Sequence, residues 1–145
     1  MNQEIRFLAF DFGLKKIGVA IGDSLIRQAR PLAIIKSEVK QQRFAQIEAL
    51  LSEWGPDQLV VGLPLTLAGE EQEASARARR FANQLHGRYG LPVVLVEEQY
   101  SSMEAQDLIR QYQQFDAKSA RRFATEDDAV AAAVILQRHL DVLAS

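Results

Sequence analysis

IRFLAFDFGLKKIGVAIGDS, from Ile5 to Ser24, carries the strongest indication of the fold. A hydrophobic run ends on Asp11, the chain turns through Gly13, and a second hydrophobic run follows up to Asp23. This pattern predicts a strand, a tight turn and a second strand. A carboxylate at the end of a buried strand is costly unless a cation, a metal or a proton compensates its charge. Asp11 is therefore the first candidate functional residue, with an ordinary turn acid as the alternative interpretation.

The remainder of the chain alternates between strand and helix patterns. Strands are predicted at 5–12, 16–23, 31–36, 58–64 and 91–99. Helices are predicted at 38–54, 70–89, 102–114 and 125–143. The tight first connections favour an antiparallel meander, and the later alternation with helices favours parallel pairing. The fold class expected is α/β, with a mixed five-stranded sheet flanked by helices.

Length and composition limit the classes of protein that fit. The chain has 145 residues, of which 48% are hydrophobic and 25% charged, so residues 1–145 are expected to form one domain. There is no cysteine, which excludes disulfides, thiolate metal sites and a cysteine nucleophile. No signal peptide and no apolar stretch of membrane-spanning length appears, so a cytoplasmic protein without a membrane partner is expected.

Local charge asymmetry is the only electrostatic signal for nucleic acid, because the net charge is −2. Basic residues cluster near the first turn, in the second helix and in 115–124, a segment without clean periodicity that we predict to be a mobile loop closing on a phosphate backbone. The candidate nucleic-acid contacts are Lys15, Lys16, Arg77, Arg80, Lys118, Arg121 and Arg122. Solvated helix faces and ordinary turn lysines are the alternative interpretation of these clusters.

Further carboxylates are expected near Asp11. Parallel strands present their carboxyl ends at one edge of a sheet, where Glu97 or Glu98 ends the last strand. Strand alternation turns these two neighbours to opposite faces, so at most one reaches the site. Asp128, with Asp127 as its runner-up, lies in the first turn of the last helix, where an acid can also serve as a cap.

Three converging carboxylates predict a site for a hard cation. The two histidines, His86 and His139, lack partners at ligand spacing and are predicted to be structural. Oxygen ligands without histidine or cysteine suit Mg²⁺ or Mn²⁺. Two such ions activate a water and stabilise the leaving oxygen in phosphodiester cleavage. The pattern therefore indicates a nuclease.

Five separated motifs resemble the YqgF family, also called RuvX. The motifs are DFGLKKIGVAIGD, VVGLPLTLAGEEQ, SARARRFANQL, EEQYSS and the pattern D-x-x-A-A-A-x-I-L beginning at Asp128. The resemblance covers nearly the whole chain. It implies an RNase H-like fold and a nuclease that matures the 5′ end of the small-subunit ribosomal RNA precursor, with that precursor as partner.

The same resemblance implies that Asp11, Glu98 and Asp128 are the catalytic, metal-binding acids. It also favours Lys15 as a residue that faces phosphate. The sequence departs from the family pattern at three positions: Gln99 replaces the arginine of a D-E-R-x-S-T motif, Leu14 replaces a small polar residue, and Ala68 replaces an acid. None of the three is one of the expected metal ligands.

Alternative functions differ in what they require. A Holliday junction resolvase acting on branched DNA would need a dimer that presents two sites, and the sequence leaves monomer and homodimer open. An actin-like ATP-binding module would need two lobes, for which the chain is too short. A ribosome-assembly factor that binds nucleic acid without cleaving it would keep the fold and the basic clusters.

Overall fold

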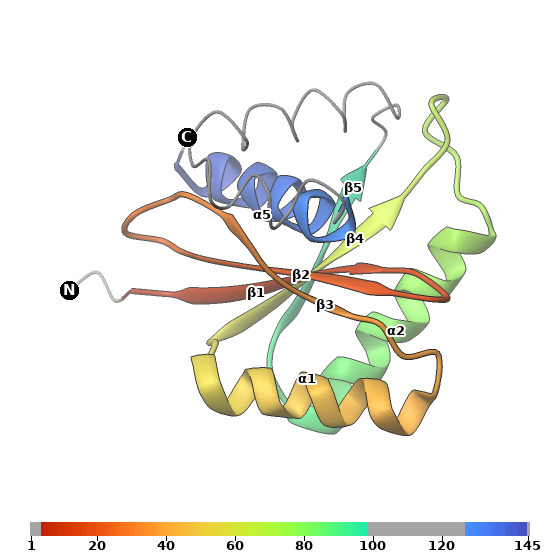
Figure 1. Ribbon diagram of the computed structural model, residues 1–145. Helices are drawn as coiled ribbons and strands as arrows, with labels where there is room; N and C mark the ends of the chain where they lie inside the picture. Colours follow the sequence, from red (N-terminus) through yellow and green to blue (C-terminus); the bar gives the residue numbers. More distant parts are fainter. Residues whose placement is uncertain (1–3, 99–126, 145) are drawn as a thin grey trace.

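The computed structural model describes residues 4–98 and 127–144, with a single mixed sheet at the centre (Figure 1). The strands are β1 (Arg6–Phe12), β2 (Ile17–Asp23), β3 (Arg30–Ile35), β4 (Gln58–Pro64) and β5 (Val93–Glu98). The helices are α1 (Lys40–Trp54), α2 (Glu73–Tyr89) and α5 (Asp127–Ala144). The spatial order of the strands is β3-β2-β1-β4-β5. Each strand predicted from the sequence is present, within one or two residues of its expected bounds.

The antiparallel meander expected from the opening sequence is confirmed. β1 and β2 pair from Arg6 with Asp23 to Phe12 with Ile17, and β2 pairs antiparallel with β3. Gly13 begins the turn between the first two strands. A Cβ atom at this position would lie 2.6 Å from the carbonyl oxygen of Lys16, so only glycine fits the turn without distortion.

The parallel half of the sheet is also confirmed. β4 lies beside β1, with Phe10 opposite Val61, and β5 lies beside β4, with Gly62 opposite Val96. Helix α1 connects β3 to β4, and α2 connects β4 to β5. The carboxyl ends of β1, β4 and β5 therefore meet at one edge of the sheet, as the site prediction requires.

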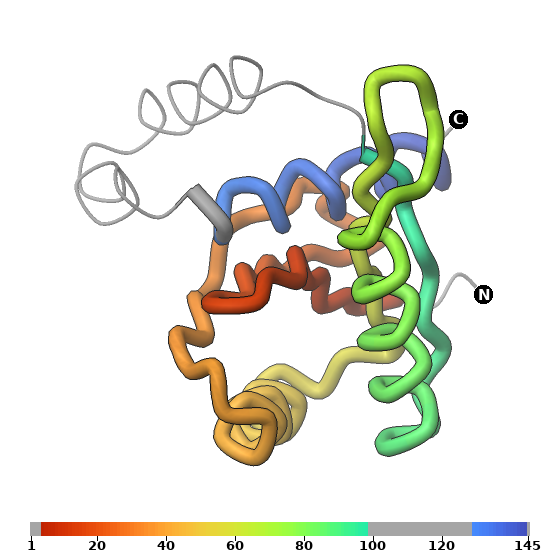
Figure 2. The backbone as a smooth tube through the Cα atoms, turned by 90° about the vertical axis from the view of Figure 1, so that its right-hand side faces the viewer, coloured from red at the N-terminus to blue at the C-terminus, as the bar shows by residue number. Residues whose placement is uncertain are grey.

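Strand alternation divides the interior into two hydrophobic cores. Leu8 and Phe10 of β1 point to the face that α1 and α2 cover, where they pack with Phe81 and other apolar side chains. Phe7 and Ala9 point to the opposite face, which α5 covers. Figure 2 shows α5 and α1 on opposite sides of the strands. Successive residues of β1 thus point alternately to the α1–α2 face and to the α5 face.

Helix α2 begins three residues later than the sequence predicts. Its N-cap is Gln72 rather than a residue near Glu70, and Gln72 and Ser75 form a reciprocal capping box. The Ser75 hydroxyl, which is fully buried, also donates to the carbonyl oxygen of Pro64. Leu65 and Glu71 form an isolated bridge. These contacts hold 65–71 as a folded-back loop and delay the start of the helix.

Several predictions concern residues outside the described ranges. They are the helix at 102–114, the loop at 115–124 and the three basic residues Lys118, Arg121 and Arg122. The backbone of Asp128 is described as part of α5, but its side chain is not. In the part of the chain that the structure covers, no helix has the length and apolar character needed to cross a membrane.

Candidate nuclease site

Asp11 and Glu98 lie on the same face of the sheet. Asp11 is two residues after Ala9 in β1, so its side chain points to the same face as that of Ala9, which packs in the core under α5. Glu98 is two residues after Val96 in β5, and Val96 also packs against that core. Both carboxylates are partly exposed, and both lie at carboxyl ends of strands. The sheet therefore brings together two acids that are far apart in the sequence.

Gly62 on β4 separates the two acids. Continuing the parallel register one step past Phe10 and Val61 places Gly62 next to Asp11. A Cβ at Gly62 would collide with Oε1 of Glu98 and with Cδ1 of Ile135. The Glu98 carboxylate thus lies directly over Gly62, about one strand spacing of 4.8 Å from the backbone at Asp11. The absent side chain is what makes room for the carboxylate.

Helix α5 runs antiparallel to β1 across this face. Ile135 lies over Gly62, while Leu136 and Leu140 lie over Gly22, which pairs with Phe7 near the start of β1. The N-terminal end of α5 is therefore directed to the edge where β1 and β5 end. This direction supports the prediction that Asp128 lies near Asp11 and Glu98. The side chain of Asp128 is not among those that the structure describes.

Glu97 points away from these acids. Because it is the neighbour of Glu98 in the strand, its side chain points to the opposite face, which α2 covers, and this side chain is exposed. The pKa of Arg79 on α2 is raised mainly by Glu71, and the negative charge of Glu97 adds to that increase. The side chain of Arg138 on α5 donates to the backbone carbonyl oxygen of Glu97 at 3.1 Å. The register therefore places Glu98, not Glu97, on the candidate face.

The donor set fits a hard divalent cation. Asp11 and Glu98 supply carboxylate oxygens, and the space above Gly62 is filled by one of these carboxylates. Among the described side chains there is no group of three or more histidine, cysteine, aspartate or glutamate residues, so a third ligand would have to come from elsewhere. Oxygen-only ligation is what Mg²⁺ and Mn²⁺ prefer.

The four predicted basic contacts within the described ranges do not share one face. Lys15 and Lys16 are exposed in the turn that joins β1 to β2. Arg77 and Arg80 lie on α2 and line a pocket on the face opposite α5. The structure thus places these two arginines on the far side of the sheet from Asp11 and Glu98.

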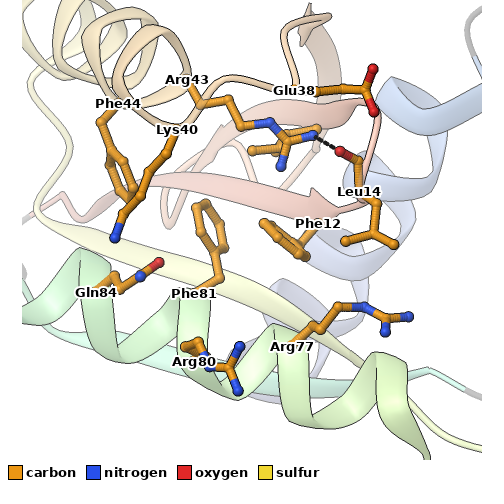
Figure 3. Close-up of a pocket in the computed structure, with 11 residues that line it drawn as sticks. Phe12, Leu14, Glu38, Lys40, Arg43, Phe44, Arg77, Arg80, Phe81 and Gln84 are labelled. Atoms are coloured by element: carbon orange, nitrogen blue, oxygen red, sulfur yellow. Dashed lines mark hydrogen bonds between the residues drawn. The ribbon is translucent and has the colours of Figure 1, made fainter.

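This α1–α2 pocket has a volume of about 220 Å³. Figure 3 shows Phe12 and Phe81 between the two helices that form its walls. Its lining residues are Phe12, Leu14, Ile17, Glu38, Lys40, Arg43, Phe44, Arg77, Arg80, Phe81 and Gln84. Four of these residues are cationic and one is anionic.

Arg43 is a residue that the sequence analysis missed. Its side chain is only 7% exposed, and its Nη2 donates to the carbonyl oxygens of Gly13 at 2.8 Å and Leu14 at 2.6 Å. Its Nε donates to the carbonyl of Ser37. Burial lowers the pKa of the guanidinium, and the nearby Glu38 carboxylate opposes that effect. The signal in the sequence was an arginine beside Phe44 in the first turn of an amphipathic helix.

Comparisons with known proteins agree with the geometry. A family model described as "RuvX: Holliday junction resolvase" matches residues 5–142. A Bordetella parapertussis protein named "Putative pre-16S rRNA nuclease" is 62% identical over 140 residues, covering 97% of this chain and 96% of the relative. A protein of the same name from Paraburkholderia phytofirmans is 48% identical and covers 98% and 92% of the two chains.

Solved structures with the same fold are also resolvases. The Fowlpox virus Holliday junction resolvase has a TM-score of 0.65 at 15% identity, covering 96% of this chain and 99% of that one. RuvC of Thermus thermophilus has a TM-score of 0.56 at 14% identity, covering 97% and 96%. These likenesses show that the sheet and its helices have the RNase H-like fold expected from the sequence.

Proposed function

Because this chain belongs to the RuvX family and is a nuclease, we propose that Asp11, Glu98 and Asp128 form the site at which it hydrolyses phosphodiester bonds. The observation that carries the proposal is the Glu98 carboxylate lying over Gly62, beside the strand that carries Asp11. The direction of α5 supports the third residue. The chain would act in the cytoplasm, as a monomer or a homodimer.

The three acids would hold magnesium or manganese. Bound there, a pair of such ions supplies Lewis-acid activation of water and neutralises charge on the leaving oxygen. The carboxylates of Asp11 and Glu98 would hold the ions and would accept hydrogen bonds from the attacking water. They also repel a phosphate that arrives without compensating cations, which makes cleavage depend on the divalent ion.

The proposed substrate is the precursor of small-subunit ribosomal RNA. The support is the shared name of the relatives at 62% and 48% identity, which between them match nearly all of this chain. Exposed Lys15 and Lys16 in the turn after Asp11 would contact phosphates next to the cleaved bond, because lysine binds phosphate as a point charge.

A branched DNA junction is the second candidate substrate. The description of the matching family as Holliday junction resolvases favours it. A resolvase must cut two strands, so this alternative expects a dimer with two equivalent sites. Cleavage assays run in parallel on a precursor ribosomal RNA and on a branched DNA junction distinguish the two candidate substrates.

Asp11→Asn tests the proposal. We expect the variant to lose divalent-dependent cleavage of a precursor ribosomal RNA 5′ fragment and of a DNA junction, while circular dichroism shows an unchanged fold. Relief of carboxylate repulsion should keep or raise its stability. The control is Asp141→Asn, an exposed acid near the other end of α5. Full activity in Asp11→Asn would overturn the proposal, and loss of folding would make Asp11 structural.

A further inference from the structure

The α1–α2 pocket carries more positive charge than its surroundings neutralise. Arg77 pairs with Glu73 at 3.8 Å, but the Glu73 side chain is 94% exposed, and an exposed pair of this kind stabilises little. Neither Lys40 nor Arg80 forms an ion pair with any residue that the structure describes. Crowded like charges repel one another, and an anion bound among them would relieve that repulsion.

Arg43 adds a buried charge to this set. Its three hydrogen bonds go to neutral carbonyls, through Nε and Nη2, and none of the bonds within residues 4–98 and 127–144 uses Nη1. In Figure 3 the second terminal nitrogen is directed to the side of the pocket where Phe12 and Phe81 lie. A buried guanidinium favours a charged acceptor, and phosphate oxygens match its planar geometry.

The beginning of α1 points to the same kind of ligand. Val39, the N-cap, forms no capping hydrogen bond through its side chain, and the first turn contains no acid. Instead it carries Lys40 and Arg43, although cations are unfavourable at the positive end of the helix dipole. An anion at this end would interact favourably with the dipole, the free amides and both cations.

The apolar wall indicates that the ligand is more than a phosphate. The Phe12 ring is partly exposed, and the Leu14 side chain is 60% exposed. The Phe81 ring packs against the Phe12 ring, with 4.8 Å between the ring centroids. Aromatic platforms beside cationic grooves bind unpaired bases of single strands. The volume of about 220 Å³ is below the roughly 300 Å³ of typical drug-sized ligand pockets, so it has room for one base but not for several nucleotides.

The position of the pocket links it to the candidate nuclease site. Asp11 and Phe12 are consecutive residues of β1, so their side chains emerge on opposite faces of the same sheet edge. The exposed turn with Lys15 and Lys16 lies between the two faces. We propose that the α1–α2 pocket binds one unpaired nucleotide of the substrate, in a single-stranded segment next to the bond cleaved at Asp11 and Glu98. This inference rests on the proposed nuclease function.

In this arrangement the cations hold the phosphate, and Phe12 and Leu14 hold the base. A base-paired nucleotide cannot enter, because its base must first leave the stack. The pocket therefore selects substrates that have a single-stranded segment beside the cleavage position. The end of a precursor ribosomal RNA can supply one, whereas a four-way DNA junction supplies one only where a base pair opens at the branch point.

A matched pair of arginines tests the phosphate contact. Binding of a short labelled oligouridylate is measured by fluorescence anisotropy in EDTA, so that no cleavage occurs. Arg80→Ala should weaken binding by about tenfold, as expected for one charge-assisted hydrogen bond. The slope of log K against log salt should fall by about 0.7. Arg79→Ala removes the same charge from the neighbouring exposed position outside the pocket and should change little.

Phe12→Leu tests the base contact. Leucine keeps an apolar side chain at this position but removes the ring. Affinity for oligouridylate should fall about fivefold or more, the lower range for loss of one base-stacking partner. Affinity for an abasic strand of the same length should not change, whereas Arg80→Ala should weaken both ligands. Equal losses in Arg79→Ala and Arg80→Ala would overturn the proposal, as would a Phe12→Leu variant that binds both strands as the wild type does.

The outcome is separable from that of the nuclease proposal. Binding in EDTA needs no catalysis, and the cleavage assay on Asp11→Asn needs no intact pocket. Normal binding by Arg80→Ala and Phe12→Leu, together with inactive Asp11→Asn, would reject the pocket and keep the nuclease site. Active Asp11→Asn would reject the nuclease site whatever the pocket variants do.

Discussion

At the scale of single residues, the alternation of side chains along β1 and β5 decides which face of the sheet each candidate residue reaches. Asp11 and Phe12 are neighbours in the sequence but serve opposite faces, one toward α5 and one toward the α1–α2 pocket. Glu97 and Glu98 divide in the same way. A shift of either strand by one residue would exchange these roles, because side chains alternate with a period of two. The strand register is therefore as important as the residue types.

The first prediction compares Glu98 with its neighbour. Glu98→Gln removes a charged oxygen ligand at nearly constant volume and should abolish metal-dependent cleavage. Glu97→Gln makes the same chemical change on the opposite face and should leave most of the activity. Both are assayed over a range of Mg²⁺ and Mn²⁺ concentrations, because excess metal can partly restore a weakened site. The reverse pattern would mean that β5 is shifted by one residue.

A second prediction concerns Gly62. Gly62→Ala places a methyl group where Oε1 of Glu98 and Cδ1 of Ile135 lie, so both must move. The free energy of unfolding should fall by about 1–3 kcal/mol, as for other overpacked cores. Cleavage should fall as well, because the displaced carboxylate is a proposed metal ligand.

Gly87→Ala is the matched control for this change. It lies in α2, where an added Cβ has no neighbour within 4 Å. It should stabilise the protein by about 0.5–1 kcal/mol, since alanine favours helix more than glycine does. Chemical denaturation and cleavage rates measure both variants. A Gly62→Ala protein with wild-type stability and activity would contradict the placement of Glu98.

At the scale of elements, α5 is the helix that closes the candidate face. Its buried side includes Ala129, Ala132 and Ala133, whose small side chains let the helix approach the sheet closely. The ring of His139 on α5 meets the ring of Phe7 on β1 edge-on, with 5.3 Å between the ring centroids. Nε2 of this histidine is buried and has no hydrogen-bond partner within the described residues. Burial of this nitrogen without a partner therefore favours the neutral imidazole.

The pH dependence of stability should reveal this histidine. Burial lowers the pKa of His139 below its ordinary value of 6.5, so the unfolded chain binds the proton first as the pH falls. The free energy of unfolding is therefore highest above about pH 6.5 and decreases as the pH falls below that value. Urea denaturation at about pH 7.5 and about pH 5.5 should show the decrease, and His139→Phe should reduce it. An identical decrease in His139→Phe would assign the effect to other groups.

At the scale of the whole molecule, negative and positive side chains gather on opposite faces of the sheet, although the net charge is only −2. The α5 face carries the paired acids at the strand ends, and the opposite face carries the cationic α1–α2 pocket. Two exposed lysines occupy the turn between these faces. A strand bound at the acids and in the proposed nucleotide pocket would pass this turn.

The basic residues of segment 115–124 provide a test at the same scale. Replacing Lys118, Arg121 and Arg122 together by alanine should weaken nucleic-acid binding, because fewer counterions are released. The slope of log K against log salt should fall by about 2 for a single strand, at about 0.7 for each lost contact. Binding titrations over a range of salt concentrations measure it. An unchanged slope would leave these residues with no role beyond solubility.

Local sequence patterns were enough to predict the five strands and the helices α1, α2 and α5, and to place Glu97 and Glu98 on opposite faces of their strand. Hydrophobic alternation, glycine turns and helical periodicity are local properties, so they predicted five strands and the order antiparallel then parallel. They also predicted that only one of Glu97 and Glu98 would share a face with the site. The family resemblance supplied the choice of Glu98, and the register agrees with it.

The contacts between segments that are distant in the sequence became known from the folded structure alone. It placed Gly62 under the Glu98 carboxylate, buried Arg43 against the carbonyls after β1, and separated Arg77 and Arg80 from the acids by the thickness of the sheet. None of these three arrangements follows from local periodicity. Periodicity shows which side chains of one strand or helix share a face, but not which other strand or helix packs against that face. Neighbours depend on strand order and helix packing, and these are set by burial over the whole chain.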